Sequence, residues 1–481
     1  MTIALLLDNP ERDLPGLALV ATRLAAAGVR AYLVPMNLAV PEVTALAPDL
    51  VLLSFVRRTN EGQVAAFQRA GIRTALLDTE GGVLDGFDPY ERIMAQSPTV
   101  REGVRPFLAW GPRIAGRARR AGWYPEGSIR VTGHPRFDLY TDPWRSIAAT
   151  ESRQRIDQLV DPDARVVLVA GTFTLANPRF STPERELRML VDQLGLDPGY
   201  VEHRLECERR ALRGLTRLAA SIARRRRDVT VVLRPHPFED ETRYRSLLDG
   251  AEGVRVVRGG SILPWLLRAR SLVQRGSTTA VEAVLAGVPV LEPAWLPAWA
   301  HLDAVEAASS ACGDTEELLT RLDDILEAPG ADGYGPTATA RRVLDEWFAP
   351  VDGRAHERVA KALRDTAAEG GPAVDRRYCR RLHYQTGGER RGGDRLRPLD
   401  RLRMAAALPR TFSFRRLEDR PLRPGWEASG KAFDATSVGR WVEALAPAVE
   451  PGFRPVVRAA RETGAYGVPF PSGRSVEVRS A

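Results

Sequence analysis

Short apolar runs alternate with amphipathic segments along the first 140 residues. The runs are only a few residues long and almost continuously apolar, which is typical of strands that are buried on both faces. The expected strands lie at residues 2–8, 29–35, 49–55, 72–78, 107–110 and 129–132. Helical spacing separates them at residues 15–27, at residues 61–70 and in a segment that ends near Gly122. This alternation predicts a parallel sheet with helices on both faces.

A second series of the same kind begins near residue 165. Its expected strands lie at residues 166–171, 229–234, 254–257, 272–274 and 288–291. Its expected helices lie at residues 201–227, 262–269 and 278–286, with more helix from Asp314 and near residues 339–348 and 353–368. The two halves therefore share one architecture, and we predict an α/β fold with two facing Rossmann-like βα domains.

The pattern changes after Gly370, where Gly-Gly pairs, arginine clusters and prolines replace the alternation. We therefore expect an N-terminal domain at residues 1–155 and a second domain at residues 156–350. A helical linker follows at residues 351–370. We expect residues 371–481 to form a basic C-terminal appendage with weak intrinsic order.

Composition excludes several classes of protein. The 481 residues are 44% hydrophobic, which suffices for packed cores. No apolar run approaches the roughly 20 residues of a membrane span, and the apolar stretch at residues 3–7 is too short for a signal peptide. Three scattered cysteines without a CxxC pair argue against a disulfide framework or a zinc site. We expect a cytoplasmic protein.

Positive charge is concentrated in one segment. Residues 376–423 contain 15 arginines and 5 acidic residues, whereas the whole chain has a net charge of only +8. The simplest partners of such a segment are phosphates or an anionic membrane surface. A solvated basic tail, or contact with acidic patches of the same protein, is the alternative. The segment lacks a recognisable aromatic pattern, so no nucleic acid is expected.

Two carboxylates follow the expected strand at residues 72–78. Asp78 and Glu80 stand just before Gly81 and Gly82, and ligands of doubly wound sheets bind beyond the carboxyl ends of strands. Either acid is a candidate general base. A turn with solvated acids is the alternative.

A second candidate is Asp138, in a Gly-His-Pro-Arg-Phe-Asp sequence after the strand at residues 129–132. Here an ordinary proline turn with an Arg–Asp pair is the alternative.

Two further stretches of the second half favour phosphate binding. Arg234 and His236 lie where a strand enters an Arg-Pro-His-Pro sequence, whose prolines restrict the backbone around the imidazole. Gly276 precedes three consecutive hydroxyl residues, Ser277, Thr278 and Thr279, at the start of an expected helix that contains Glu282. Helix N-terminal N–H groups favour anions. The alternatives are a structural histidine and a plain N-cap with a capping-box glutamate.

The order of these four stretches resembles the bacterial surface-carbohydrate biosynthesis family, which has the GT-B glycosyltransferase fold. The motifs are similar to those of bacterial sialyltransferases, β-Kdo transferases and CDP-glycerol glycerophosphotransferases. The resemblance covers roughly residues 1–350, and the Gly-Lys-Ala-Phe sequence at residues 430–433 is similar to the family's C-terminal end.

The resemblance implies a role for each candidate. Asp78 or Glu80 would deprotonate the acceptor hydroxyl, and Asp138 would be the nucleophile if the enzyme retains configuration. His236 would contact the leaving nucleotide phosphate. The remaining donor-site residues would be Arg234, Gly276, Ser277, Thr278, Thr279 and Glu282. The first domain would then be the acceptor side and the second the nucleotide-donor side.

We therefore predict a GT-B-type nucleotide-sugar glycosyltransferase of surface polysaccharide biosynthesis, such as that of capsule or lipopolysaccharide. Its donor would carry a cytidine nucleotide, and its acceptor would be a lipid-linked or oligosaccharide chain at the inner membrane. No DxD motif or His/Asp spacing suggests a divalent ion, so we expect neither a metal nor a cofactor besides the donor. The alternatives are a CDP-glycerol or polyol-phosphate transferase, a UDP-sugar 2-epimerase-like enzyme and a non-catalytic membrane-associated scaffold.

Overall fold

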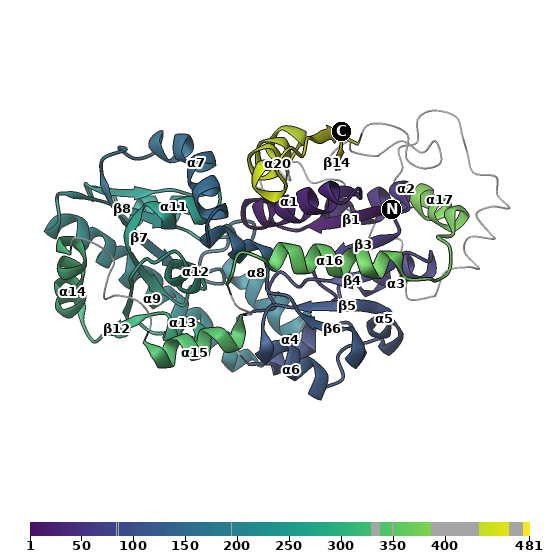
Figure 1. Ribbon diagram of the computed structural model, residues 1–481. Coiled ribbons are helices and arrows are strands. Elements are labelled where there is room, and N and C mark those ends of the chain that lie inside the picture. Colours follow the sequence, from purple (N-terminus) through teal and green to yellow (C-terminus); the bar gives the residue numbers. More distant parts are fainter. Residues whose placement is uncertain are drawn as a thin grey trace, which may run out of the picture. The chain divides into compact units, whose positions relative to one another are not determined.

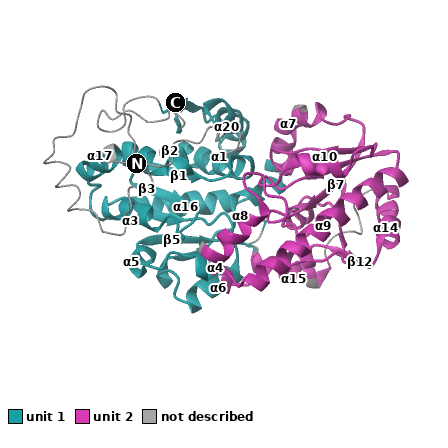
Figure 2. Ribbon diagram, turned by 180° about the vertical axis from the view of Figure 1, so that it is seen from behind, with its two compact units in different colours: residues 1–82, 91–144, 348–481 teal, residues 83–90, 145–347 magenta. Residues whose placement is uncertain are grey.

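A computed structural model describes residues 1–82, 84, 86–193, 195–328, 337–348, 351–385, 432–460 and 475–481. The chain forms two compact units (Figure 2). The first consists of Met1–Gly82, Glu91–Trp144 and Phe348–Ala481, and the second of Val83–Tyr90 and Arg145–Trp347. The change of unit thus comes at the start of helix α7 (Trp144–Asp157) rather than at residue 155.

The first unit is built on a sheet in which six parallel strands follow the predicted alternation (Figure 1). The described strands lie in the order β13-β14-β2-β1-β3-β4-β5-β6. The parallel ones are β1 (Thr2–Leu7), β2 (Arg30–Pro35), β3 (Leu50–Leu53), β4 (Arg73–Leu76), β5 (Val104–Ala109) and β6 (Ile129–Val131). Leu5 in β1 pairs with both Leu33 and Leu52, so the centre of the sheet is apolar on successive strands.

Helices cover this sheet. They are α1 (Pro10–Ala26), α2 (Ala39–Leu46), α3 (Glu61–Arg69), α5 (Pro98–Glu102), α6 (Pro112–Arg120), α16 (Ala355–Ala368), α17 (Arg376–Gln385) and α20 (Ala435–Val449), with α4 (Asp88–Ile93) at the change of unit. α1 begins five residues before the predicted start. There the Asn9 side chain accepts a hydrogen bond from the Glu11 N–H, and Pro10 occupies the first helical position.

Residues near the C-terminus complete the first sheet. β14 (Val476–Ser480) pairs antiparallel with β2, and β13 (Pro455–Ala459) pairs antiparallel with β14. Helix α20 packs on α1, and the Tyr32 hydroxyl donates to Glu477 at 2.9 Å. The described parts of residues 371–481 are therefore ordered elements of the first unit, whereas the sequence pattern suggested an appendage. Residues 386–431 lie outside the described residues, and they include most of the arginine-rich segment at residues 376–423.

The second unit contains a parallel sheet with the strand order β12-β11-β10-β7-β8-β9. Its strands are β7 (Arg165–Gly171), β8 (Val229–Arg234), β9 (Val254–Val256), β10 (Ala269–Arg275), β11 (Val290–Pro293) and β12 (Ser310–Cys312). The helices besides α7 are α8 (Pro183–Arg188), α9 (Pro198–Arg225), α10 (Glu241–Leu247), α11 (Leu263–Arg268), α12 (Thr279–Leu285), α13 (Asp303–Ala307), α14 (Thr315–Glu327) and α15 (Ala338–Trp347).

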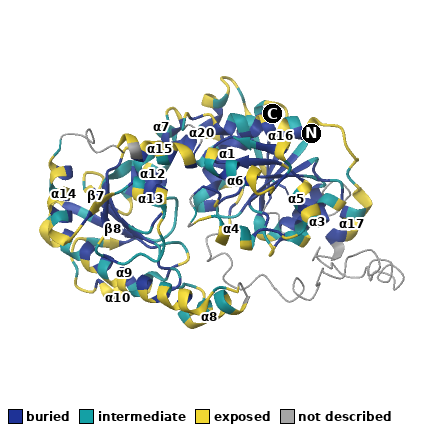
Figure 3. Ribbon diagram, turned by 90° about the horizontal axis from the view of Figure 1, so that it is seen from below, coloured by how far each residue is buried: buried dark blue, intermediate teal, exposed yellow. Residues whose placement is uncertain are grey.

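Burial follows the predicted pattern in both units. The central strands are buried, the edge strands β9, β12 and β13 are partly exposed, and the outward faces of the helices are exposed (Figure 3). In the second unit, the apolar faces of α9 and α14 pack with strands β7, β8 and β10 in one core. The predicted α/β class with two Rossmann-like units is confirmed. No helix among the described residues is long and apolar enough to cross a membrane.

Candidate functional site

Two predicted stretches of the second unit lie at the same edge of its sheet. β8 ends at Arg234 and β10 ends at Arg275, and both strands are parallel neighbours of β7. Parallel strands end on one side, so the His236 turn and the Gly276 turn both follow carboxyl ends, where α/β proteins bind ligands. The structure thus brings these two stretches to one edge of the sheet.

The turn after β10 presents backbone and hydroxyl groups at the start of α12. Gly276 has a φ of +63°, in the left-handed region that glycine enters readily. The Ser277 N–H donates to Gln274 Oε1 at 2.9 Å, and the Ser277 Oγ accepts the Thr279 N–H at 3.3 Å. Thr278 is exposed, and Glu282 lies one turn later with 9% of its surface accessible. The Ser277 and Thr279 N–H groups are thus engaged within the turn, and the exposed Thr278 is the residue that the turn presents to solvent.

His236 sits in a turn that orients its ring. The Phe238 N–H donates to His236 Nδ1 at 3.3 Å, and the Glu239 N–H donates to the His236 carbonyl at 2.8 Å. A neutral imidazole whose Nδ1 accepts carries its proton on Nε2. The residue is half-buried, so part of its surface is accessible to solvent.

Arg234 is engaged within the protein. Its guanidinium donates to the carbonyls of Gly259 at 2.7 Å and Gly260 at 2.8 Å, and its Cζ lies 5.6 Å from the centroid of the Trp265 ring. Only 8% of its surface is accessible. These contacts anchor the loop at residues 259–260, so Arg234 has a structural role besides the predicted ligand role.

Two buried carboxylates beside this edge were missed by the sequence analysis. Glu239 is fully buried and accepts the Phe173 N–H at 2.6 Å and the Tyr244 hydroxyl. Burial raises the pKa of Glu239 to about 8, although the hydrogen bonds from Tyr244 and Phe173 oppose the shift. Glu208, on α9, accepts the Leu175 N–H at 2.8 Å. Both acids thus hold the loop that follows β7.

That loop is also tied directly to the His236 loop. The Arg179 N–H donates to the Phe238 carbonyl at 2.8 Å. The Asn177 side-chain amide donates to the Asp240 carbonyl at 2.8 Å, and the Asp240 N–H donates to the Asn177 carbonyl at 3.2 Å. The backbone around His236 is therefore braced from the neighbouring strand, which restricts the position of the imidazole.

A small recess lies next to the Gly276 turn. Its wall includes Arg275, whose guanidinium pairs with the buried carboxylate of Glu292. The lining residues are Thr172, Phe173, Cys207, Glu208, Ala211, Arg275, Gly276, Pro297, Ala298, Trp299, Ala300 and Leu302. The recess places the middle of α9 and the loop after β11 beside the predicted phosphate turn.

In the first unit, the structure separates the roles of the two predicted acids. Asp78 is 2% accessible, and its Oδ1 accepts the Glu80 N–H at 2.9 Å, while its carbonyl accepts the Trp110 indole N–H at 2.7 Å. The Glu80 side chain is 57% accessible and accepts from Arg57 at 2.8 Å. Asp78 therefore shapes the turn, whereas Glu80 presents its carboxylate to solvent.

Arginines that the sequence analysis did not single out surround these acids. Burial opposes a high pKa for Arg12, but its bond to Asp13 at 2.7 Å and the charges of Glu80 and Asp8 outweigh burial and raise it. Arg136 lies over the Trp110 ring, with its Cζ 5.0 Å from the centroid. This edge of the first sheet thus combines carboxylates, guanidinium groups and aromatic faces.

His134 lies at the same edge but differs from His236. It is buried, and its Nδ1 accepts the Arg136 N–H at 3.2 Å. Burial, together with the charges of Arg136 and Arg12, lowers its pKa well below 6.5, so the ring is neutral. The ring also lies edge-on to Trp110, with centroids 4.8 Å apart. This is a core position.

Asp138, the predicted nucleophile, caps helix α16. Its carboxylate accepts the N–H groups of Ala355 at 2.9 Å and His356 at 2.7 Å, and it lies 2.9 Å from His356 Nδ1. Only 1% of its surface is accessible. These contacts satisfy the free N–H groups at the start of α16 and give Asp138 a structural role. None of these hydrogen bonds involves Asp78 or Glu80.

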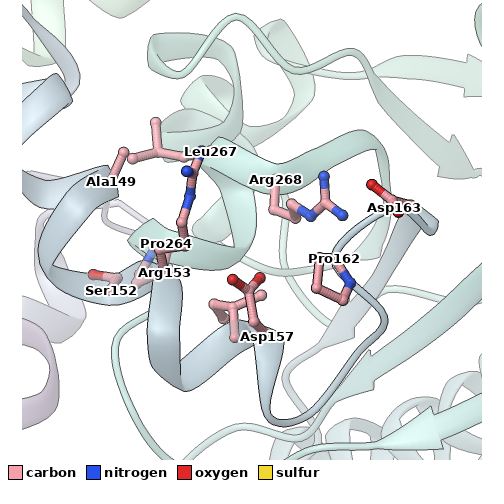
Figure 4. Close-up of a pocket in the computed structure, with 10 residues that line it drawn as sticks. Ala149, Ser152, Arg153, Asp157, Pro162, Asp163, Pro264, Leu267 and Arg268 are labelled. Carbon is pink, nitrogen blue, oxygen red and sulfur yellow. The ribbon is translucent and has the colours of Figure 1, made fainter.

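A separate cavity of about 310 Å³ lies between α7 and α11 (Figure 4). Its residues precede the starts of β7 and β10, so it belongs to the amino edge of the second sheet. None of the predicted site residues lines it. Among the described residues, no group of three or more His, Cys, Asp or Glu side chains could hold a metal ion.

Comparison with known proteins supports the fold. The UDP-GlcNAc 2-epimerase from Methanocaldococcus jannaschii has a TM-score of 0.50 and 14% identity, over 76% of this chain and 100% of that chain. The chain has a GT-B-type fold. No family model matches it, and no curated protein matches it.

Two other solved structures have lower scores. The UDP-GlcNAc 2-epimerase from Neisseria meningitidis, bound to UDP-GlcNAc, has a TM-score of 0.47 and 13% identity, over 76% of this chain and 100% of that chain. The wall teichoic acid polymerase TagF has a TM-score of 0.47 and 14% identity, over 76% of this chain and 88% of that chain. At such identities, likeness describes architecture and leaves the chemistry to the residues themselves.

Proposed function

We propose that this protein is a glycosyltransferase of bacterial surface polysaccharide biosynthesis, which transfers a sugar from a cytidine-nucleotide donor to a glycan or lipid-linked acceptor. The observation that carries the proposal is the pair of turns at one edge of the second sheet. One carries the hydroxyls of Ser277, Thr278 and Thr279 at the start of α12, and the other orients His236.

These turns suit a departing nucleotide phosphate. The bond between the sugar carbon and the phosphate oxygen breaks with its electron pair on the phosphate, so negative charge develops there. Ser277, Thr278 and the Nε2–H of His236 can donate to that oxygen, and preorganised donors of this kind lower the barrier. A Cβ at Gly276 would meet no described atom within 4 Å, so the backbone at this turn is open to a ligand.

The acceptor hydroxyl needs a base, and Glu80 is our choice over Asp78. The hydroxyl oxygen forms the new bond to the sugar carbon while its proton moves to a Glu80 carboxylate oxygen. Asp78 positions Glu80 through the bond to its backbone N–H. Asp138 has no part in this proposal, because its carboxylate caps α16.

Ligand-dependent melting tests the donor. A nucleotide at 100 times its dissociation constant stabilises a protein by about 2.7 kcal/mol, so CMP, CDP, UDP, GDP and UDP-GlcNAc are compared. CMP or CDP should raise the melting temperature, and Ser277→Ala should weaken that response. A response to uridine nucleotides alone would contradict the cytidine donor. Isomerisation of UDP-GlcNAc without an acceptor would favour an epimerase, and CDP-glycerol turnover would favour polyol-phosphate transfer.

We also propose that the arginine-rich segment contacts an anionic membrane. Helix α17 is its described part, with Cys379 and Leu382 buried and Arg377, Arg380 and Arg381 exposed. Guanidinium groups on one helix face attract anionic headgroups. Replacement of these three arginines by alanine should reduce sedimentation with phosphatidylglycerol vesicles and leave turnover of a soluble acceptor unchanged. Equal sedimentation with zwitterionic vesicles would contradict this role.

A further inference from the structure

A groove of about 520 Å³ runs along α9 in the second unit, outside the predicted site. One wall is α9 itself, and the other is formed by the loop after β11 and the start of α14. The lining residues are Arg210, Arg213, Gly214, Arg217, Leu218, Ser221, Trp295, Leu296, Pro297 and Thr315. Its size is within the range of ligand-binding pockets.

Gly214 lets the two walls approach each other. A Cβ at this position would lie 2.4 Å from Leu296 Cδ2, closer than any side chain can tolerate. The glycine therefore seats Leu296 against α9, while Trp295 and Pro297 line the groove beside it. The groove is thus defined by packing of the core rather than by loose surface side chains.

Three arginines on one face of α9 supply the charge. Arg210, Arg213 and Arg217 are exposed, and no hydrogen bond or ion pair joins their guanidinium groups to any described residue. Residues three, four and seven apart lie on the same side of a helix. At 1.5 Å per residue, the three span about 10 Å along the axis.

Several charges near the groove are paired with one another. Arg204 pairs with Glu208 at 2.7 Å, and Arg225 pairs with Asp323 at 2.8 Å. The acids at the start of α14 are also engaged, because Glu316 bonds to Arg225 and Glu317 bonds to Arg321. None of these contacts involves Arg210, Arg213 or Arg217, so these acids do not compensate the positive charge of the groove.

We propose that this groove binds an extended acidic glycan with regularly repeated anionic groups. A single phosphate is small beside three arginines whose positions span about 10 Å of the helix axis, whereas a polymer with a charge on each unit can extend along all three. Trp295, which is partly buried against the core, lines the same groove and adds apolar contact area. Pro297 lines both this groove and the recess beside Gly276, so the groove leads toward the proposed donor turn.

That the polymer is a glycan rests on the proposed function. That the groove binds a polyanion rests only on its arginines. The test therefore measures binding without donor or turnover. Fluorescence anisotropy of a labelled oligogalacturonate is followed at low ionic strength with the full chain. The groove variant changes Arg210, Arg213 and Arg217 to alanine. The matched control changes Arg227, Arg255 and Arg341, which are exposed in the same unit but do not line the groove.

We expect the groove variant to lose about 30-fold in affinity, since each exposed charge pair contributes about threefold. The control should lose threefold at most, although its net charge changes equally. A second variant, Arg213→Glu, should weaken binding further than Arg213→Ala, and melting temperatures verify that all variants fold.

Equal losses in the groove and control variants would overturn the proposal, as would absence of binding by the folded parent protein. Tighter binding of single-stranded oligouridylate through the same arginines would also overturn it in favour of nucleic acid. A protein that binds the oligogalacturonate but transfers no sugar would refute the proposed function and leave the groove's role intact.

Discussion

The carboxylate of Glu239 accepts the backbone N–H of Phe173 at 2.6 Å. This bond links the loop that carries His236 to the loop that follows β7, and Tyr244 closes the arrangement from α10. Since the acid is fully buried, its protonation is coupled to folding.

The first prediction concerns the pH dependence of stability. Burial raises the pKa of folded Glu239 to about 8 from 4.5, so the folded state binds this proton more tightly than the unfolded state. The resulting stability is present below about pH 4.5 and is lost as pH rises toward 8. Glu239→Gln carries no such charge, so the difference between its melting temperature and that of the parent should increase in favour of the variant from about pH 4.5 to about pH 8. Parallel curves would contradict the buried-acid interpretation.

The second prediction separates the two histidines that precede a proline at a strand end. His236→Ala should reduce turnover by about 10² or more with little change in melting temperature, because it removes a donor to the leaving phosphate. His134→Ala should lower the melting temperature, because it opens a buried space beside Trp110. Steady-state kinetics and thermal melting of both variants check this. Near-normal turnover of folded His236→Ala would refute its role.

The third prediction concerns Glu80 and Asp78. Glu80→Gln removes the proposed base from an exposed position, so turnover should fall while stability changes by about 0.5 kcal/mol or less. Asp78→Asn changes a buried acceptor that bonds to the Glu80 N–H, so its main effect should be lower stability. The free energy of unfolding in urea and the rate of sugar transfer, both measured for each variant, test this prediction. The opposite pattern would make Asp78 the base.

The fourth prediction concerns Asp138. Asp138→Ala leaves the N–H groups of Ala355 and His356 without their acceptor, so unfolding should become easier by about 2–4 kcal/mol. Turnover per folded molecule should change little. Exposed Asp163 provides a control for loss of an acid, since Asp163→Ala should scarcely alter unfolding. Abolished turnover in a fully stable Asp138→Ala protein would restore the nucleophile role.

Much of the fold follows from local pattern. Apolar runs and helical spacing located strands such as β1 and β8 and the long helix α9 to within a few residues, because side-chain periodicity is a property of neighbouring positions. The Gly276 turn and the His236-Pro237 turn were also found at strand ends, since glycine and proline act on their own backbone.

The roles of several side chains depend on distant partners. Asp138 meets N–H groups 217 and 218 residues away, and Glu239 meets one 66 residues away. Tyr32 and Glu477 are 445 positions apart, yet they join β2 to a strand that the composition after Gly370 did not indicate. Local pattern carries no information on such pairs.

The sequence by itself determined the α/β class, the order of strands β1 to β11 along the chain and the turns that carry the candidate ligands. Only the tertiary structure decided which acid is buried or exposed, which histidine lies in a core and which arginines remain unpaired along α9. The physical reason is that burial and hydrogen bonding depend on which segments pack together, and chain folding brings those segments from far apart.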